Sequence, residues 1–262
     1  MIVMSKKDLL LQRLDQIGES LKNTGQALAL LGLGSVGKEL DRLDEYSDLD
    51  FFVIAKKGSK MRFIEKLDWL TSISPVTYYF QNTDDGYKLL YEDGVYCEFA
   101  IFEEKELADV DFAEGRIVWK EDGFDESICS PKDKSIRWKL KSKEWAIGEA
   151  LTCLYVGLTR FARGEKLSGT RFIQNYAVDN LLSLSNLIED EVDYYKDKYQ
   201  NERRYEKRYP KTAKQLSEMI QGYDRCPDSA IKIVEFIDHN FEINQAMKRV
   251  IVDLANELRN KI

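Results

Sequence analysis

The first half of the chain alternates short apolar runs with polar turns, a pattern typical of a small β-sheet with flanking helices. Apolar residues at helical spacing predict one helix over residues 6–21 and another over residues 61–70. An apolar run predicts a strand over residues 27–33, and runs that contain aromatic and β-branched residues predict strands over residues 48–55, 76–80, 87–91, 95–102 and 115–123. Glu92-Asp93-Gly94 has the composition of a hairpin turn, so the strand over 95–102 should return antiparallel to the strand over 87–91.

The pattern changes after Pro131, beyond which apolar residues recur at helical spacing almost to the end of the chain. Helices are predicted over residues 132–163, from 170 into the polar 190s, over 211–222 and over 228–260. The charged stretch 190–210 is either a solvated helix extension or a loop. We therefore expect an α+β chain. A small mixed β-sheet with flanking helices is expected to form one domain over residues 1–130. An all-α helical bundle is expected to form a second domain over residues 131–262.

Two aspartates, Asp48 and Asp50, open the strand predicted over residues 48–55. Because side chains alternate along a strand, both should project from one face, roughly 6–7 Å apart at Cα. Like charges at this spacing repel each other unless a cation lies between them, and oxygen-only ligands favour Mg²⁺ or Mn²⁺. The alternative is that both are solvated turn residues, as surface carboxylates commonly are.

A Gly-Ser turn, Gly34-Ser35, follows the strand over 27–33 and precedes a polar segment over 36–43 that can begin as a short helix. In that case the backbone N–H groups after Gly34 would point at whatever lies above the turn, and phosphate oxygens are the favoured occupants. Lys38 would add a positive charge there. The alternative for Lys38 is an ordinary solvated surface lysine.

Glu98 lies in the strand over 95–102, where it should share a face with Tyr96 and Ala100 while Cys97 and Phe99 face the other way. A glutamate with such apolar neighbours suggests a functional carboxylate. The alternative is an edge-strand glutamate that reaches solvent.

Gly34-Ser35, followed after twelve residues by Asp48-Leu49-Asp50 between apolar flanks, resembles the signature of the polymerase-beta-like nucleotidyltransferase superfamily. The run over residues 46–50 is close to the form found in small bacterial antibiotic nucleotidyltransferases. This resemblance implies that Asp48 and Asp50 are ligands shared by two metal ions and that Gly34 and Ser35 bind the β- and γ-phosphates of a nucleoside triphosphate. It also implies that Glu98, from the strand beside the aspartates, is a third metal ligand on the acceptor side and a proton acceptor.

The helical half resembles the lincosamide and kanamycin nucleotidyltransferases, in which a helical domain completes the acceptor pocket. Gly157 and Arg163-Gly164-Glu165, followed by Arg171, are similar to the helix-turn-helix of the lincosamide group. Arg171 could then contact a phosphate, and Glu149 or Glu144 could act as a base; the alternative for each is an exposed helix residue. The run over residues 37–40 departs from the family's usual glycine-rich pattern between the serine and the first aspartate.

Composition and charge restrict the classes of binding partner expected for this 262-residue chain. The net charge of −7 argues against a nucleic-acid partner and suits a cationic small molecule. The four cysteines form no C-x-x-C pair, so neither a zinc site nor a disulfide is expected. We expect the protein to reside in a reducing compartment, the cytoplasm. No apolar stretch approaches the roughly 20 residues that span a bilayer, so a membrane is not expected as a partner. A homodimer is left open.

The leading hypothesis is a Mg²⁺-dependent enzyme that transfers a nucleoside monophosphate from a nucleoside triphosphate to a hydroxyl of a small cationic acceptor. AMP is the first choice of transferred group. An aminoglycoside or lincosamide antibiotic is the first choice of acceptor. One alternative is a nucleotide-binding regulatory protein, such as the partner in a toxin–antitoxin pair, that keeps the fold. Another is nucleotidylation of a protein or a tRNA end. The single histidine, His239, is expected to be an ordinary helix residue.

Overall fold

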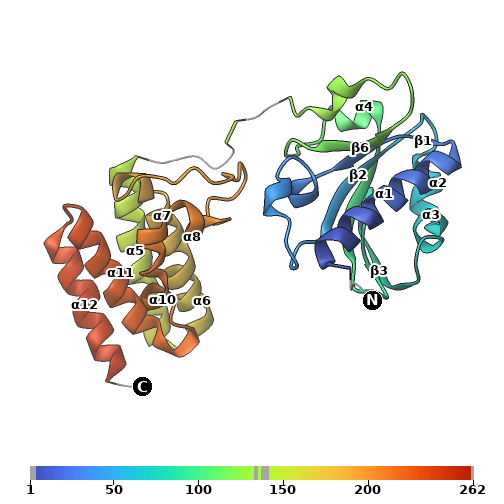
Figure 1. Cartoon of the computed structure of the whole chain (residues 1–262). Coiled ribbons are helices and arrows are strands. Elements are labelled where there is room, and N and C mark those ends of the chain that lie inside the picture. Colours follow the sequence, from blue (N-terminus) through green and yellow to red (C-terminus); the bar gives the residue numbers. More distant parts are fainter. Residues whose placement is uncertain (1–3, 133–134, 137–141, 261–262) are drawn as a thin grey trace. The chain divides into compact units, whose positions relative to one another are not determined.

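The computed structural model describes residues 4–132, 135–136 and 142–260. The chain divides into two compact units, Met1–Lys134 and Ser135–Ile262, shown in blue to green and in yellow to red in Figure 1. The first unit contains the sheet and the second consists of helices and loops. The predicted fold class, a mixed sheet with flanking helices followed by a helical part, is confirmed.

Six strands form one sheet in the first unit, in the order β3-β4-β5-β2-β1-β6. Their bounds are β1 (Ala27–Gly32), β2 (Leu49–Ala55), β3 (Val76–Thr83), β4 (Gly86–Tyr91), β5 (Tyr96–Glu103) and β6 (Arg116–Lys120). β2 and β5 run parallel, and the other neighbouring pairs are antiparallel. The predicted hairpin is confirmed, because β4 and β5 pair antiparallel across the turn at Gly94.

One face of the sheet is covered by α1 (Lys6–Thr24), α2 (Lys60–Glu65) and α3 (Asp68–Thr71). α1 lies across the sheet in Figure 1 and buries Leu10, Leu14 and Ile17 against it. The single helix predicted over residues 61–70 is wrong, since the chain leaves helical geometry at Lys66. The break lets Trp69 turn into the core, where its ring meets three phenylalanine rings edge-on and its indole donates to the carbonyl of Phe63.

The opposite face is covered over only part of its length. A smaller core there joins Ala29 and Leu31 of β1 and Ile54 of β2 to residues of α4 (Glu104–Leu107) and of the segment after it. Asp50 and Glu98 lie on this face, beyond that core, with Asp48 just ahead of β2, and each of the three is half-exposed. The partial cover leaves room for a site at this end of the sheet.

The second unit packs helices around one apolar core. Its helices are α5 (Lys143–Ala162), α6 (Lys166–Thr170), a π-helix over Arg171–Ala177, α7 (Val178–Leu182), α8 (Tyr205–Arg208), α9 (Pro210–Ala213), α10 (Leu216–Met219), α11 (Cys226–Asn240) and α12 (Gln245–Arg259). The helix predicted from residue 132 begins at Lys143, where Ser142 caps it; residues 133–134 and 137–141 lie outside the described residues. The helix predicted over 228–260 is two helices, because the chain is extended at Phe241 and Asn244 caps α12.

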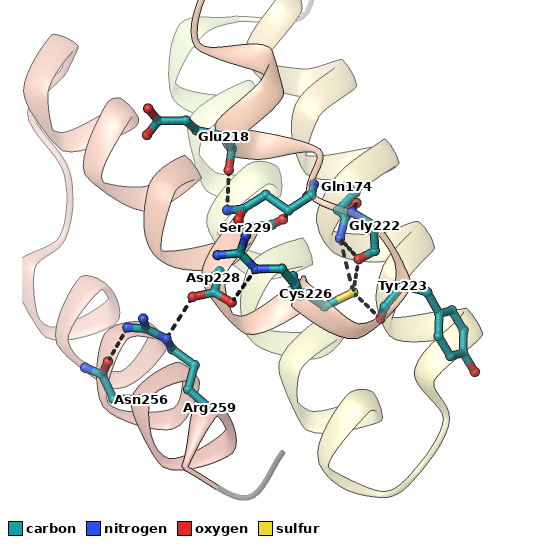
Figure 2. A network of polar contacts seen from close by, with 11 residues as sticks. Gln174, Glu218, Gly222, Tyr223, Cys226, Asp228, Ser229, Asn256 and Arg259 are labelled. Carbon is teal, nitrogen blue, oxygen red and sulfur yellow. Dashed lines mark hydrogen bonds and ion pairs between the residues drawn. The ribbon is translucent and has the colours of Figure 1, made fainter.

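The helices predicted from 170 and over 211–222 are likewise divided into shorter pieces. Their connections depend on polar contacts that no apolar period signals. In Figure 2 the Gln174 amide of the π-helix donates to the Gly222 carbonyl at 2.7 Å and accepts from its N–H at 3.0 Å. Asp228 of α11 pairs with Arg259 of α12 at 2.8 Å in the same view. The Gln174 bonds tie the π-helix to the turn at Gly222, and the Asp228–Arg259 pair joins α11 to α12.

The charged stretch over residues 190–210 is mostly a loop, one of the two predicted alternatives. The fully buried Arg208 holds it, donating to Glu191 Oε1 at 2.7 Å and to the Asn201 carbonyl at 3.0 Å. Gly157 of α5 and Gly169 of α6 allow these two helices to pack closely, since a Cβ on Gly169 would lie 2.8 Å from the Gly157 carbonyl oxygen. Within the described residues, no helix is long and apolar enough to span a bilayer.

Candidate active site

Two acidic residues from neighbouring strands lie side by side in the first unit. Asp50 of β2 pairs with Glu98 of β5 in the parallel register, so both side chains lie on the same face of the sheet. Asp48 comes two residues before Asp50, immediately ahead of β2, and its negative charge acts on the Tyr96 hydroxyl of β5. The structure therefore places Asp50 beside Glu98, with Asp48 two residues before Asp50.

Glu98 has two donors within hydrogen-bonding distance. Lys88 of β4, its partner in the antiparallel register, donates through Nζ at 2.8 Å, and the Tyr96 hydroxyl donates at 3.1 Å to the same oxygen. The hydrogen bond and charge of Glu98 raise the pKa of Lys88, with a smaller contribution from Asp50. Burial and the charge of Glu98 raise the pKa of Tyr96. Lys88 therefore stays cationic at neutral pH beside two carboxylates.

Sequence reasoning did not single out Lys88. The signal was present, because counting outward from the hairpin turn places Lys88 directly opposite Glu98.

The Gly-Ser turn lies directly beside Asp50. Gly34 adopts a positive φ of 52°, a conformation that costs side-chain-bearing residues about 1–2 kcal/mol, and a Cβ there would lie 3.6 Å from Asp50 Oδ2. The Leu33 N–H donates to the Asp50 carbonyl at 2.8 Å, which ties the start of the turn to β2. The turn and the aspartate therefore form one rigid arrangement.

The short helix predicted over residues 36–43 is replaced by two single 3₁₀ turns, Gly34–Val36 and Leu40–Arg42. Such short turns supply little helix dipole, so any anion site here depends on backbone geometry and side chains. Lys38 is exposed and Ser35 half-buried. A cation that the sequence did not suggest lies close by: Arg42 Nη2 is 4.0 Å from the position of a Cβ on Gly34. Arg42 also pairs with Glu39.

The candidates from the helical half lie in the second unit. Glu149 is half-buried on α5, whereas Glu144, near the start of the same helix, is exposed. Arg171, the first residue of the π-helix, is also exposed. Their roles stay predictions from the sequence.

The donor chemistry of the carboxylates fits a divalent metal ion, because all three supply hard oxygen ligands. Their arrangement fits less completely. Across residues 4–132, 135–136 and 142–260, no group of three or more His, Cys, Asp or Glu side chains is close enough to hold an ion. Glu98 is held by Lys88 and Tyr96. Asp48 and Asp50 are thus the residues that would hold a metal, and Glu98 would join them by turning from Lys88.

A cavity of about 430 Å³ lies elsewhere, in the second unit. It is lined by α10, α11 and the segments around Glu189 and Thr212, and it includes the single histidine, His239. None of its lining residues belongs to the predicted site. The chemistry of the sheet carboxylates, rather than the size of this hollow, locates the candidate active site.

No protein-family model matches the sequence, and no curated protein matches it significantly. Among solved structures, an aminoglycoside 6-adenyltransferase from Bacillus subtilis is 15% identical, with a TM-score of 0.31 over 98% of this chain and 92% of that one. A CCA-adding enzyme solved in complex with ATP is 12% identical, with a TM-score of 0.32 over 98% and 72% of the two chains. At these TM-scores neither match carries weight for the activity.

Proposed function

We propose that this protein transfers a nucleoside monophosphate, AMP in the first instance, from a nucleoside triphosphate to a hydroxyl of a small cationic acceptor such as an aminoglycoside or lincosamide. The observation that carries the proposal is the pairing of Asp50 with Glu98 on one face of the sheet, with Asp48 just ahead of β2 and the turn at Gly34 beside Asp50. Nucleotidyl transfer needs positioning and neutralisation of charge more than covalent help from the protein. Paired carboxylates next to a tight backbone turn meet that need.

In this proposal the turn binds the leaving part of the donor. Gly34 and Ser35 approach the β- and γ-phosphates through their backbone, and Arg42 and Lys38 supply positive charge. Asp48 and Asp50 hold Mg²⁺ or Mn²⁺, which when bound neutralises phosphate charge and acidifies the attacking hydroxyl. Glu98 accepts the proton of the acceptor hydroxyl. In the metal-free protein Lys88 and Tyr96 hold the Glu98 carboxylate through the hydrogen bonds that they donate to it, and Tyr96 keeps it oriented when it turns from Lys88.

The direct test is a pyrophosphate-release assay with Mg²⁺, each common nucleoside triphosphate and a panel of aminoglycosides, lincosamides and small RNAs. Release that requires an antibiotic acceptor, and that Asp50→Asn abolishes, is the expected result. Release only with RNA would favour nucleotidylation of RNA ends. Triphosphate binding without release for any acceptor would favour the regulatory alternative and overturn the enzymatic proposal.

Gly34→Val should weaken triphosphate binding at least about tenfold, because a β-branched residue resists positive φ and its side chain would occupy the approach to Asp50. Calorimetric titration with a non-hydrolysable triphosphate measures this. Gly25→Val is the matched control. Gly25 has a φ of 65° at the end of α1 with no atom within 4 Å of an added Cβ, so it imposes backbone strain away from the site. Equal affinities in the two variants would exclude the turn as the phosphate site.

Lys88→Met should tighten Mg²⁺ binding about threefold to tenfold, or roughly 0.7–1.4 kcal/mol. The change removes a positive charge beside Asp50 and frees the Glu98 carboxylate from its lysine partner. Titration of the nucleotide-free protein with MgCl₂ gives the dissociation constant. Lys57→Met, at an exposed loop position, should leave it unchanged. If Lys88→Met leaves the Mg²⁺ dissociation constant unchanged, Glu98 and Asp50 do not face the ion.

A further inference from the structure

The edge strand β3 presents an unusual exposed surface. It contains no charged residue, yet three consecutive aromatic side chains, Tyr78, Tyr79 and Phe80, are 54%, 63% and 53% exposed. Natural sheets commonly protect an edge strand with charged residues or proline. Exposed aromatic residues that are grouped in this way often mark a binding surface.

The strand register connects two of these aromatic residues to the carboxylates. Phe80 pairs with Lys88, Lys88 with Glu98, and Glu98 with Asp50, so these four residues form one row across β3, β4, β5 and β2. Direct partners in a sheet share a face, and Phe80 therefore lies on the carboxylate face.

Tyr78 belongs to a neighbouring row on this face. It pairs with Leu90, and Leu90 pairs with Tyr96, the residue that donates to Glu98. Tyr79 lies on the opposite face, where its ring approaches that of Tyr87. Two of the three exposed rings thus accompany the carboxylates and the third does not.

The geometry of in-line transfer indicates which substrate, the nucleotide or the acceptor, approaches this surface. The attacking oxygen and the leaving pyrophosphate must lie on opposite sides of the transferred phosphorus. The phosphate-binding turn at Gly34 follows β1, on one side of β2, whereas β5, β4 and β3 extend from the other side. The acceptor hydroxyl therefore approaches from the side of Glu98. Neighbouring strands are about 4.8 Å apart, which places the Phe80 position about 10 Å from that of Glu98.

We infer that Tyr78 and Phe80 bind a ring of the acceptor, and that this ring carries an amine. The inference rests on the proposed function and adds the acceptor surface to it. Aromatic faces stack on rings and attract ammonium groups. Lys88 lies between Phe80 and Glu98, but the three carboxylates Asp48, Asp50 and Glu98 outnumber this one cation, so the charges beyond the rings remain net negative and favour a cationic ligand. A separation of about 10 Å suits a compound of two or more linked rings, with one ring on Tyr78 and Phe80 and a hydroxyl of the next ring at Glu98.

The test is acceptor binding by calorimetry, with kanamycin, streptomycin and lincomycin as probes, in the presence of Mg²⁺ and a non-hydrolysable triphosphate. Tyr78→Ala and Phe80→Ala should each weaken binding about fivefold to tenfold, with the triphosphate affinity unchanged. Phe80→Tyr, which keeps the ring, should bind as the wild type does. Tyr79→Ala is the matched control on the same strand, with greater exposure and the opposite face, and should also bind normally.

The outcomes separate this inference from the proposed function. Turnover with unaltered affinity in Tyr78→Ala and Phe80→Ala would leave the function standing and overturn the acceptor surface. Binding of a probe that depends on both rings, without pyrophosphate release, would support the surface and overturn the function. Equal weakening by Tyr79→Ala, or no binding of any probe by the wild type, would overturn the surface. Sedimentation that slows in Phe80→Ala alone, at unchanged acceptor affinity, would assign the strand to a second copy of the chain and overturn it as well.

Discussion

Asp50→Asn should lower the turnover number at least about a thousandfold, a loss of about 4 kcal/mol of transition-state stabilisation, while the melting temperature stays equal or rises. Asp50 lies between the phosphate turn and Glu98, with Gly34 on one side and β5 on the other. Replacing its carboxylate with an amide keeps the shape and removes a charge that a metal ion would need. The same change relieves repulsion from Asp48 when no ion is bound.

Steady-state pyrophosphate release and thermal unfolding of the same preparations measure the two effects. Asp41→Asn is the matched control. Asp41 is exposed on the segment that leads to β2, and its replacement changes the net charge by the same amount. Its activity should match that of the wild type. Strong destabilisation of the metal-free protein by both Asp48→Asn and Asp50→Asn would assign the aspartates a structural role and remove the basis of the proposed site.

Glu98→Gln should lower the turnover number about a hundredfold, with little change in the dissociation constants of triphosphate and acceptor. The glutamine oxygen can still accept from Lys88 and Tyr96, so the local structure persists while the negative charge and the basic site are lost. Single-turnover kinetics separates the chemical step from binding.

Tyr96→Phe is the companion variant, since it removes one donor to Glu98 and keeps the carboxylate. Its turnover should fall by less than about tenfold, the expected effect of losing one orienting hydrogen bond. If Glu98→Gln retains activity within about threefold of the wild type, a loss under ~1 kcal/mol, Glu98 is neither the third ligand nor the proton acceptor.

Local periodicity was sufficient to predict the strands around the site. The apolar runs that became β1, β2, β4 and β5, and the hairpin turn at Gly94, are local signals that the sheet preserves. The helices were less well predicted at their ends. The break at Lys66 follows from burying Trp69 among three phenylalanine rings, a requirement that no local pattern expresses. In the second unit, polar contacts such as Gln174 to Gly222 set boundaries that helical spacing alone does not.

The sequence by itself determined which chemical groups this protein offers: two carboxylates two residues apart at the start of a strand, a glycine turn upstream, and a glutamate among apolar neighbours on another strand. The period of two in a β-strand is a local property, so it survives whatever the rest of the chain does. Only the tertiary structure decided which groups meet. The parallel pairing of β2 with β5 sets Glu98 beside Asp50, because strands distant in sequence choose their partners through the shared core. The same pairing brings Lys88 to Glu98 and extends the row to Phe80, since a register across four strands is a property of the assembled sheet.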